Sequence, residues 1–194
     1  SGNTDAKIKL PSAGGIYESD GSTPVLTESG GVVSLGSGVA LPDGSVLQIK
    51  SAVTSAYAEI SGNYPNNDVI PVKTGGGEVI TQAITASDSS NTFLIVANIS
   101  GSPATNDFCS IALFKDDDTN AIAAIGHSAG GNDYQMSPLT LVCKNVAGST
   151  DEITYKVRAG CTGFNFQVNG DGPARKLGGV AATTLTIYEI KGGI

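Results

Sequence analysis

Three consecutive carboxylates, Asp116-Asp117-Asp118, form the densest group of metal-ligand side chains in the sequence. Such residues hold Ca²⁺ when their spacing lets several oxygens converge on one ion, as in an EF-hand loop. Consecutive residues of an extended chain point in alternate directions, so these three converge only with help from the backbone. We interpret the cluster as the solvated tip of a turn between two strands, with a calcium site as the less favoured alternative.

The remaining catalytic candidates lack the context that their chemistry requires. His127 is the sole histidine, so a Ser-His-Asp triad would have to use it, yet no GxSxG nucleophile motif accompanies it. The glycine runs at 75–77 and 130–131 lack the lysine and the strand-to-helix context of a phosphate-binding loop. We expect His127 to be structural or at an interface. The sequence predicts a protein that is not an enzyme and that has no cofactor.

Aromatic, amide and charged side chains occur together in the long loops of the chain. Aromatic rings pack on the apolar faces of sugars, while amides and charged groups bind sugar hydroxyls. The candidate residues for a glycan site at one end of the molecule are Tyr64, Asn66, Asn67, Asn132, Asp133, Tyr134, Arg175 and Lys176. Exposed loops without a ligand have a similar composition, so a glycan site and ordinary loops both remain open at this stage.

Strands must position these loops, and three runs in the second half of the chain show the period of two that is typical of strands. The runs are residues 139–146, 153–158 and 164–168. In the first run Leu139, Leu141 and Cys143 share one face. Small turn-forming residues separate the runs, so the sequence predicts a hairpin and a third strand that form a meander. Phe164 and Phe166 are expected on one side of the third strand.

Further segments alternate in the same manner. They are residues 46–53, 79–85, 92–99, 108–115, 121–127 and 183–190. About nine strands, 26 glycines and a charged fraction of only 15% are typical of an all-β protein with many tight turns. The sequence therefore predicts an antiparallel jelly-roll sandwich.

Two of these strands are apolar on both faces, in residues 93–97 and 111–114. A two-layer sandwich covers only the inner face of each sheet, so a second apolar face implies a second buried surface. The simplest such surface is a subunit interface. The residues assigned to the core or to this interface are Phe93, Ile95, Ile111, Leu113, Tyr188 and Ile190.

The length of the apolar segments divides the chain into an arm, residues 1–44, and a jelly-roll domain, residues 45–194. The arm holds three short apolar segments that cannot form a stable core alone. A segment that docks on a partner and a flexible linker are both open interpretations of it. Within the domain, residues 61–77 form an Asn-, Pro- and Gly-rich loop that is long for a compact fold, so it is either functional or mobile.

The cysteines and the charge restrict the partners. Cys109, Cys143 and Cys161 are an odd number without a CxxC motif, and we expect all three to be reduced. A net charge of −7 argues against a nucleic-acid partner, which requires clustered Lys and Arg. The apolar runs are far shorter than a bilayer span, and no charged-then-apolar leader begins the chain, so membrane insertion is not expected.

Five segments along the domain carry a resemblance to a known family. They are FCSIALFKD at 108–116, GHSAGG at 126–131, Ser137-Pro138, TYKV at 154–157 and TLTIYEI at 184–190. In these segments the chain resembles the C-terminal domains of tailed-phage virion proteins. The segment DGSTPVLTE at 20–28 resembles the attachment segments of the same proteins. The resemblance implies a trimeric C1q/TNF-like jelly roll without catalytic residues. The two-sided apolar strands are expected of such a trimer.

Two functional hypotheses follow from the resemblance. The first is a homotrimeric, non-enzymatic protein of the virion surface, assembled in the host cytoplasm, that decorates the capsid or forms a short head fibre. In this hypothesis residues 1–44 bind other virion proteins. The alternative is the receptor-binding tip of a tail fibre, which recognises glycans of the host surface.

Overall fold

The computed structural model describes residues 15–17, 24–29, 32–35, 41–105, 107–128 and 136–192. By its internal contacts the chain divides into two compact units, Ser1–Pro42 and Asp43–Ile194. The first unit contains a three-stranded antiparallel sheet with the order β1-β2-β3. Its strands are β1 (Gly15–Tyr17), β2 (Pro24–Ser29) and β3 (Val32–Leu35).

The second unit is a sandwich of two antiparallel sheets. The six-stranded sheet consists of β4 (Val46–Thr54), β5 (Ala58–Ile60), β7 (Thr92–Pro103), β10 (Ser137–Val146), β12 (Phe166–Val168) and β15 (Thr183–Ile190). The four-stranded sheet consists of β6 (Gly77–Thr85), β8 (Phe108–Lys115), β9 (Ala123–Ser128) and β11 (Glu152–Cys161). The remaining elements are β13 (Gly170–Asp171), β14 (Ala174–Arg175) and a 3₁₀ turn, Leu177–Gly179.

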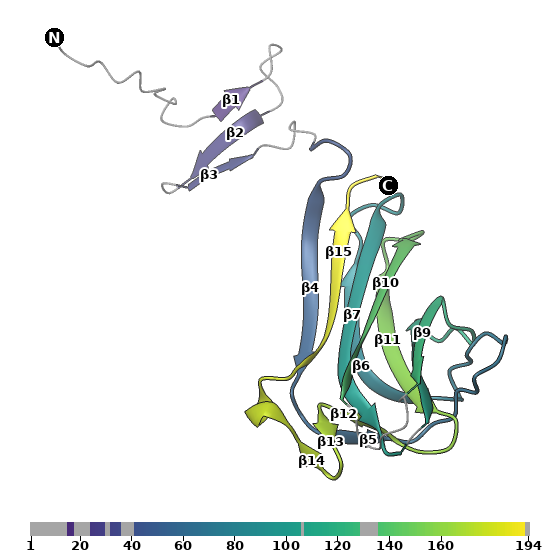
Figure 1. Ribbon diagram of the computed structural model, residues 1–194. Helices are drawn as coiled ribbons and strands as arrows, with labels where there is room; N and C mark the ends of the chain where they lie inside the picture. The colour runs from purple at the N-terminus through teal and green to yellow at the C-terminus, as the bar shows by residue number, and fades with distance from the viewer. Residues whose placement is uncertain are drawn as a thin grey trace. The chain divides into compact units, whose positions relative to one another are not determined.

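The order of the long strands is that of a jelly roll. One sheet has the order β4-β15-β7-β10 and the other has the order β6-β11-β8-β9 (Figure 1). Successive long strands thus cross repeatedly between the sheets, which is the double Greek-key connection of this fold. The predicted all-β jelly-roll sandwich is confirmed. No helix among the described residues is long and apolar enough to cross a bilayer.

The predicted meander in the second half of the chain is wrong. Strand β10 pairs with β7, whereas β11 pairs with β6 and β8 in the other sheet. The connection between them crosses the end of the sandwich, where the backbone amide of Ala147 donates to the carbonyl of Asn91 at 2.9 Å. Alternation shows which side chains of a strand face the core. It does not show to which of the two sheets the strand belongs, because strands of both sheets alternate in the same way. Leu139 and Leu141 are buried as predicted.

The third run is shorter than the sequence predicts. Strand β12 begins at Phe166, which is buried, whereas Phe164 lies before the strand and is 52% exposed. The two phenylalanines therefore do not share a buried face. Phe164 instead belongs to a turn, and its own backbone amide donates to the Asp107 carboxylate at 3.1 Å.

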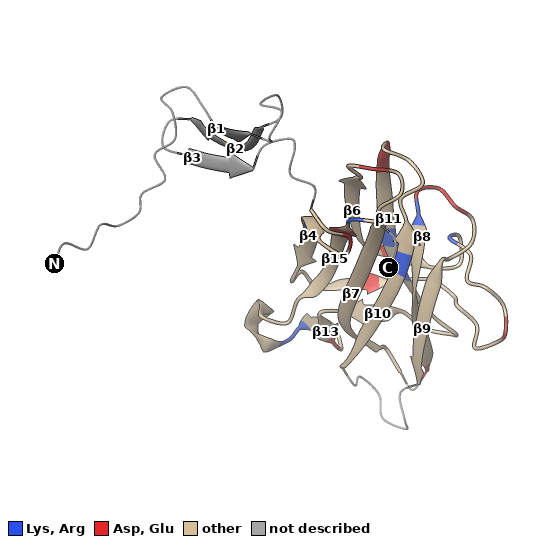
Figure 2. Cartoon of the chain, turned by 90° about the horizontal axis from the view of Figure 1, so that it is seen from above, with Lys and Arg blue, Asp and Glu red and all other residues tan. Residues whose placement is uncertain are grey.

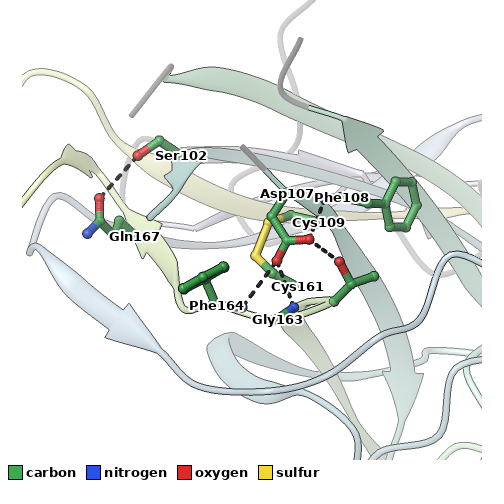
Figure 3. Close-up of a disulfide and its surroundings, with 9 residues drawn as sticks. Ser102, Asp107, Phe108, Cys109, Cys161, Gly163, Phe164 and Gln167 are labelled. Carbon is green, nitrogen blue, oxygen red and sulfur yellow. Dashed lines mark hydrogen bonds between the residues drawn. A yellow bond between two sulfur atoms is a disulfide. The ribbon is translucent and has the colours of Figure 1, made fainter. Parts of the chain in front are cut away.

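A disulfide joins Cys109 on β8 to Cys161 on β11, where the two residues lie directly opposite each other (Figure 3). The predicted reduced state of these two cysteines is wrong, and Cys143 is the free thiol. The bond spans 52 residues of sequence, and a crosslink of that span stabilises a fold by roughly 2–4 kcal/mol. The prediction failed because the pairing depends on the register of two strands that are distant in sequence.

The Asp107 carboxylate organises the chain beside this disulfide. It accepts hydrogen bonds from the amides of Phe108 at 2.8 Å and Gly163 at 2.7 Å, and from the hydroxyl of Thr162. Burial raises the pKa of Asp107, but the hydrogen bonds lower it by more than burial raises it. The net pKa therefore lies below its ordinary value. The turn that follows Cys161 is thus fixed by an ionised carboxylate.

A second carboxylate, Glu189 on β15, is fully buried at the other end of the sandwich. It accepts hydrogen bonds from Gln48 Nε2 at 2.6 Å, from the amide and hydroxyl of Ser87 at 2.7 Å, and from Asn91 Nδ2 at 2.6 Å. Burial raises the pKa of Glu189, but the hydrogen bonds outweigh burial and the net pKa is lowered. The network ties β15 to β4 and to the loop between β6 and β7.

This network predicts a specific pH dependence. The pKa of Glu189 is lower in the folded state, so its contribution to stability is complete above the unfolded value of about 4.3 and is lost as the pH falls through the lower folded value. Glu189→Gln should lower the free energy of unfolding by about 1–3 kcal/mol at neutral pH, because a neutral amide accepts these hydrogen bonds less well. The measurement is urea unfolding at about pH 6 and about pH 3.

The wild-type protein should lose more stability than the variant between these two pH values. Other titrating groups, Asp107 included, are common to both proteins and cancel in the comparison. Equal losses in the two proteins would contradict the assignment.

Candidate functional site

The outer face of the four-stranded sheet is covered by the long loop before β6. Tyr64 of this loop packs in a small apolar cluster with Ala112 and Phe114, two of the outward-facing residues of β8. The loop is anchored at the sheet by the amide of Cys161, which donates to the carbonyl of Gly62 at 3.0 Å, and by Arg158 Nε, which donates to the carbonyl of Gly76 at 2.9 Å.

Two strands that are apolar on both faces predict a subunit interface, and the loop corrects this prediction for one of them. Ile111 and Leu113 are fully buried in the core between the sheets, and the alternate residues of β8 are buried by the chain's own loop. The second apolar face of residues 111–114 is therefore not a subunit interface. The sequence could not reveal this, because the loop that covers the strand precedes it by about forty residues.

Three glycines make room for the Tyr64 ring. A side chain at Gly76 would overlap the ring, and side chains at Gly75 and Gly160 would approach it to 3.0 and 3.1 Å. The ring is 2% exposed and so offers no face on which a sugar could stack, contrary to the sequence interpretation. Burial raises the pKa of Tyr64 to about 12, against the lowering influence of the positive charge of Arg158.

The contribution of Tyr64 to stability should come from the ring rather than the hydroxyl, which makes no hydrogen bond within the described residues. Tyr64→Ala should lower the free energy of unfolding by about 3–5 kcal/mol, as expected of a buried aromatic ring. Tyr64→Phe keeps the ring and should change stability by less than about 1 kcal/mol. Denaturant unfolding of both variants tests this, and equal losses would contradict the account.

Beside Tyr64, the loop and the strands β8 and β9 line a cavity of about 360 Å³ that is open to solvent. This volume falls within the range of small-molecule sites. The cavity is lined by Asn63, Tyr64, Pro65, Asn66, Asn67, Val69, Ile70, Pro71, Val72, Gly75, Phe108, Ser110, Ala124, Ile125 and Gly126. We call it the loop cavity. The lining contains hydroxyl and amide groups but no Lys, Arg, Asp or Glu side chain.

The structure brings together only part of the predicted glycan set. Tyr64, Asn66 and Asn67 all line the loop cavity. Arg175 lies on β14, which pairs with β13, and does not line this cavity. The candidates Asn132, Asp133 and Tyr134 lie outside the described residues, and Lys176 lines a different depression with Asp171 and Leu177. Phe108 and Ser110, which the sequence interpretation missed, belong to the cavity.

Two of the three consecutive carboxylates have separate partners. Asp116 Oδ1 accepts a hydrogen bond from the amide of Thr154 at 2.7 Å. Asp117 forms ion pairs with Lys73 at 3.5 Å and Lys156 at 3.7 Å. Within the described residues, no group of three acidic, His or Cys side chains is arranged to hold a metal ion. The cluster links the turn after β8 to β11 and to the long loop.

His127 on β9 lies 3.3 Å from the hydroxyl of Ser137, measured from Nε2 to Oγ. The described residues place no carboxylate in hydrogen-bond contact with this imidazole. The contact links the ends of β9 and β10, which belong to different sheets.

The outer face of the six-stranded sheet has a different character. Phe93 and Ile95 of β7 face the core, whereas the alternate residues Leu94 and Val96 face outward and remain partly exposed. Tyr188 of β15 lies opposite Leu94 on this outer face, while Ile190 is buried beyond an irregularity in the strand. The interface candidates Phe93, Ile95, Ile111, Leu113 and Ile190 are thus buried within the domain, and Tyr188 is on the uncovered face.

Cross-strand partners extend this outer face over four strands. Its outward residues on β4, β15, β7 and β10 are Ile49, Ser51, Val53, Thr184, Thr186, Tyr188, Leu94, Val96, Asn98, Thr140, Val142, Lys144 and Val146. Only Lys144 among them is charged, in keeping with the sparse charge on the strands (Figure 2). The side chains of Ile49, Val53, Val142 and Val146 are 56–65% exposed. We call this surface the apolar face.

Comparisons with known proteins add only general similarity. No protein-family model matches the chain. No curated protein sequence matches it. Similar solved structures include the C-terminal domain of EclA, described as a sugar-binding protein, with 15% identity and a TM-score of 0.36 over 69% of this chain and 81% of that chain.

Two further similar structures have comparable scores. The Eiger TNF of S. frugiperda is 8% identical, with a TM-score of 0.38 over 71% of this chain and 94% of that chain. A chain of the T13 IBDV viral particle is 13% identical, with a TM-score of 0.33 over 87% of this chain and 40% of that chain. At these values the similarities carry no argument about function.

Proposed function

We propose that the chain is a non-enzymatic structural protein of a bacteriophage virion surface, in which three copies associate through the apolar face. Residues 1–44 attach the jelly roll to other virion proteins. The apolar face is the observation that carries the proposal. The phage setting and the number of three copies rest on the sequence resemblance.

The apolar face has the properties of a self-association surface. Large aliphatic side chains such as Val53 and Val142 expose more than half of their area there. Contiguous exposed apolar surface of this kind is typical of protein interfaces. Only Lys144 of the face is charged, so three copies of the face around a common axis meet little like-charge repulsion. Depletion of charge is typical of interface cores.

One further feature supports a role on the outside of a particle. The Cys109–Cys161 disulfide is of a kind that persists in proteins working outside the reducing cytoplasm. A phage protein assembled in the cytoplasm meets such conditions after lysis.

The alternative function, a receptor-binding tip that recognises host glycans, draws support from one observation. The loop cavity is lined by two exposed residues of the predicted glycan set, Asn66 and Asn67. Capsid decoration and receptor binding differ in where the protein lies on the particle.

Immunogold electron microscopy of virions, with antibodies raised against the purified chain, tests the proposed location. Labelling over the capsid is the expected result. Labelling confined to the tail tip would favour the alternative, and particles without the protein would overturn both.

The apolar face predicts a matched pair of variants. Val142→Glu places a charge in the proposed interface, where burying it unpaired is costly, and should convert the trimer to monomer. Val180→Glu makes the same change at a residue that is 86% exposed and outside the apolar face, and should leave the trimer intact. Light scattering gives the masses, and thermal unfolding confirms that both variants fold. A Val142→Glu variant with the mass of the Val180→Glu variant would contradict the interface.

A further inference from the structure

Ser110 on β8 is a buried polar residue without an internal partner. It is 5% exposed, it lines the loop cavity, and its hydroxyl makes no hydrogen bond within the described residues. Buried polar groups are nearly always hydrogen-bonded, and an exception requires an explanation. A partner that enters the cavity is one such explanation.

Residues without side chains flank Ser110 in the sheet. The residues directly opposite it on the two neighbouring strands are both glycines, Gly126 on β9 and Gly160 on β11. A side chain at Gly126 would overlap the ring of Phe108, and one at Gly160 would touch the ring of Tyr64. The serine therefore lies between two aromatic rings on the floor of the cavity.

The rest of the lining selects for the chemistry of a ligand. Val69, Ile70 and Pro71 contribute apolar surface, and the first two are more than half exposed beside the cavity. Asn66 and Asn67 contribute amides, which both donate and accept hydrogen bonds. A ligand that matches this lining has an apolar face and several uncharged hydrogen-bonding groups.

Charge excludes other classes of ligand. The lining holds no ionisable side chain except the buried Tyr64, so an ionic group would enter without a counter-charge. The net charge of −7 also repels anions. A purely apolar ligand would leave the hydroxyl of Ser110 and the amides without partners.

We propose that the loop cavity binds a neutral saccharide unit, with its apolar face against Phe108 and the loop and with a hydroxyl or acetamido group bound to Ser110. A sugar ring combines an apolar face with a rim of uncharged hydroxyls, as the lining requires. The site belongs to a single chain and lies on the opposite sheet from the apolar face. It therefore does not depend on the proposed trimer.

The test is binding of immobilised trisaccharides to the full-length protein. The neutral probes are chitotriose, cellotriose and mannotriose, and the acidic probe is trigalacturonate. At least one neutral probe should bind, and trigalacturonate should not. Binding of no neutral probe, or of trigalacturonate in preference, would overturn the proposal.

Variants locate the binding site. Ser110→Ala should weaken binding by about threefold to tenfold, which corresponds to one lost hydrogen bond. Ala124→Phe fills the cavity and should abolish binding, whereas Ala56→Phe, the same change at an exposed alanine outside it, should not. Arg175→Ala is a second control that should bind normally.

Circular dichroism and solution mass separate this proposal from the assembly role. Both cavity variants should fold and keep the mass of the wild-type protein. Unchanged binding by Ala124→Phe would overturn the assignment of the cavity. A monomeric wild-type protein that binds the neutral probe would contradict the trimer and leave the cavity assignment intact.

Discussion

The rest of this structure depends on one constraint, which is that the apolar faces of its sheets must be kept out of water. A jelly roll hides the inner faces of its two sheets against each other, but each sheet also has an outer face that must tolerate water. One outer face is covered from within, by Tyr64 and the loop that carries it. The other retains exposed residues such as Val53 and Val142. The same physical requirement is thus met within the chain on one side, and in the proposed trimer a second copy would meet it on the other.

The internal cover explains why the cavity exists where it does. The Tyr64 ring fits only because Gly75, Gly76 and Gly160 lack side chains. It seals one part of the sheet while the loop extends over β8 and β9 without filling the space beneath it. Backbone hydrogen bonds fix the loop at the sheet, and a wall ordered in advance would lower the entropic cost of binding the proposed ligand. The cover and the candidate site are therefore one piece of architecture.

Periodicity predicted the long strands and, in residues 139–146, the buried side that holds Leu139 and Leu141, because facing is a local property of the chain. It left the core side open in residues 93–97 and 111–114, where both faces are apolar. It did not predict which strands pair, and so it missed both the crossing between β10 and β11 and the disulfide of Cys109 with Cys161. Only the loop residues of the candidate site were predicted, because the strand residues depend on which strands pair. Loop composition indicated Asn66, but the contribution of Ser110 depends on the glycines beside it in the sheet.

The most direct test of this account is sedimentation equilibrium of the unaltered full-length protein over a wide range of concentrations. The account predicts a mass of three chains, which persists on dilution because the apolar face would otherwise be exposed to water. A mass of one chain at every concentration would contradict it. In that case the outer face of the six-stranded sheet would be a solvated surface, and the loss of its partner would remove the basis for the proposed assembly.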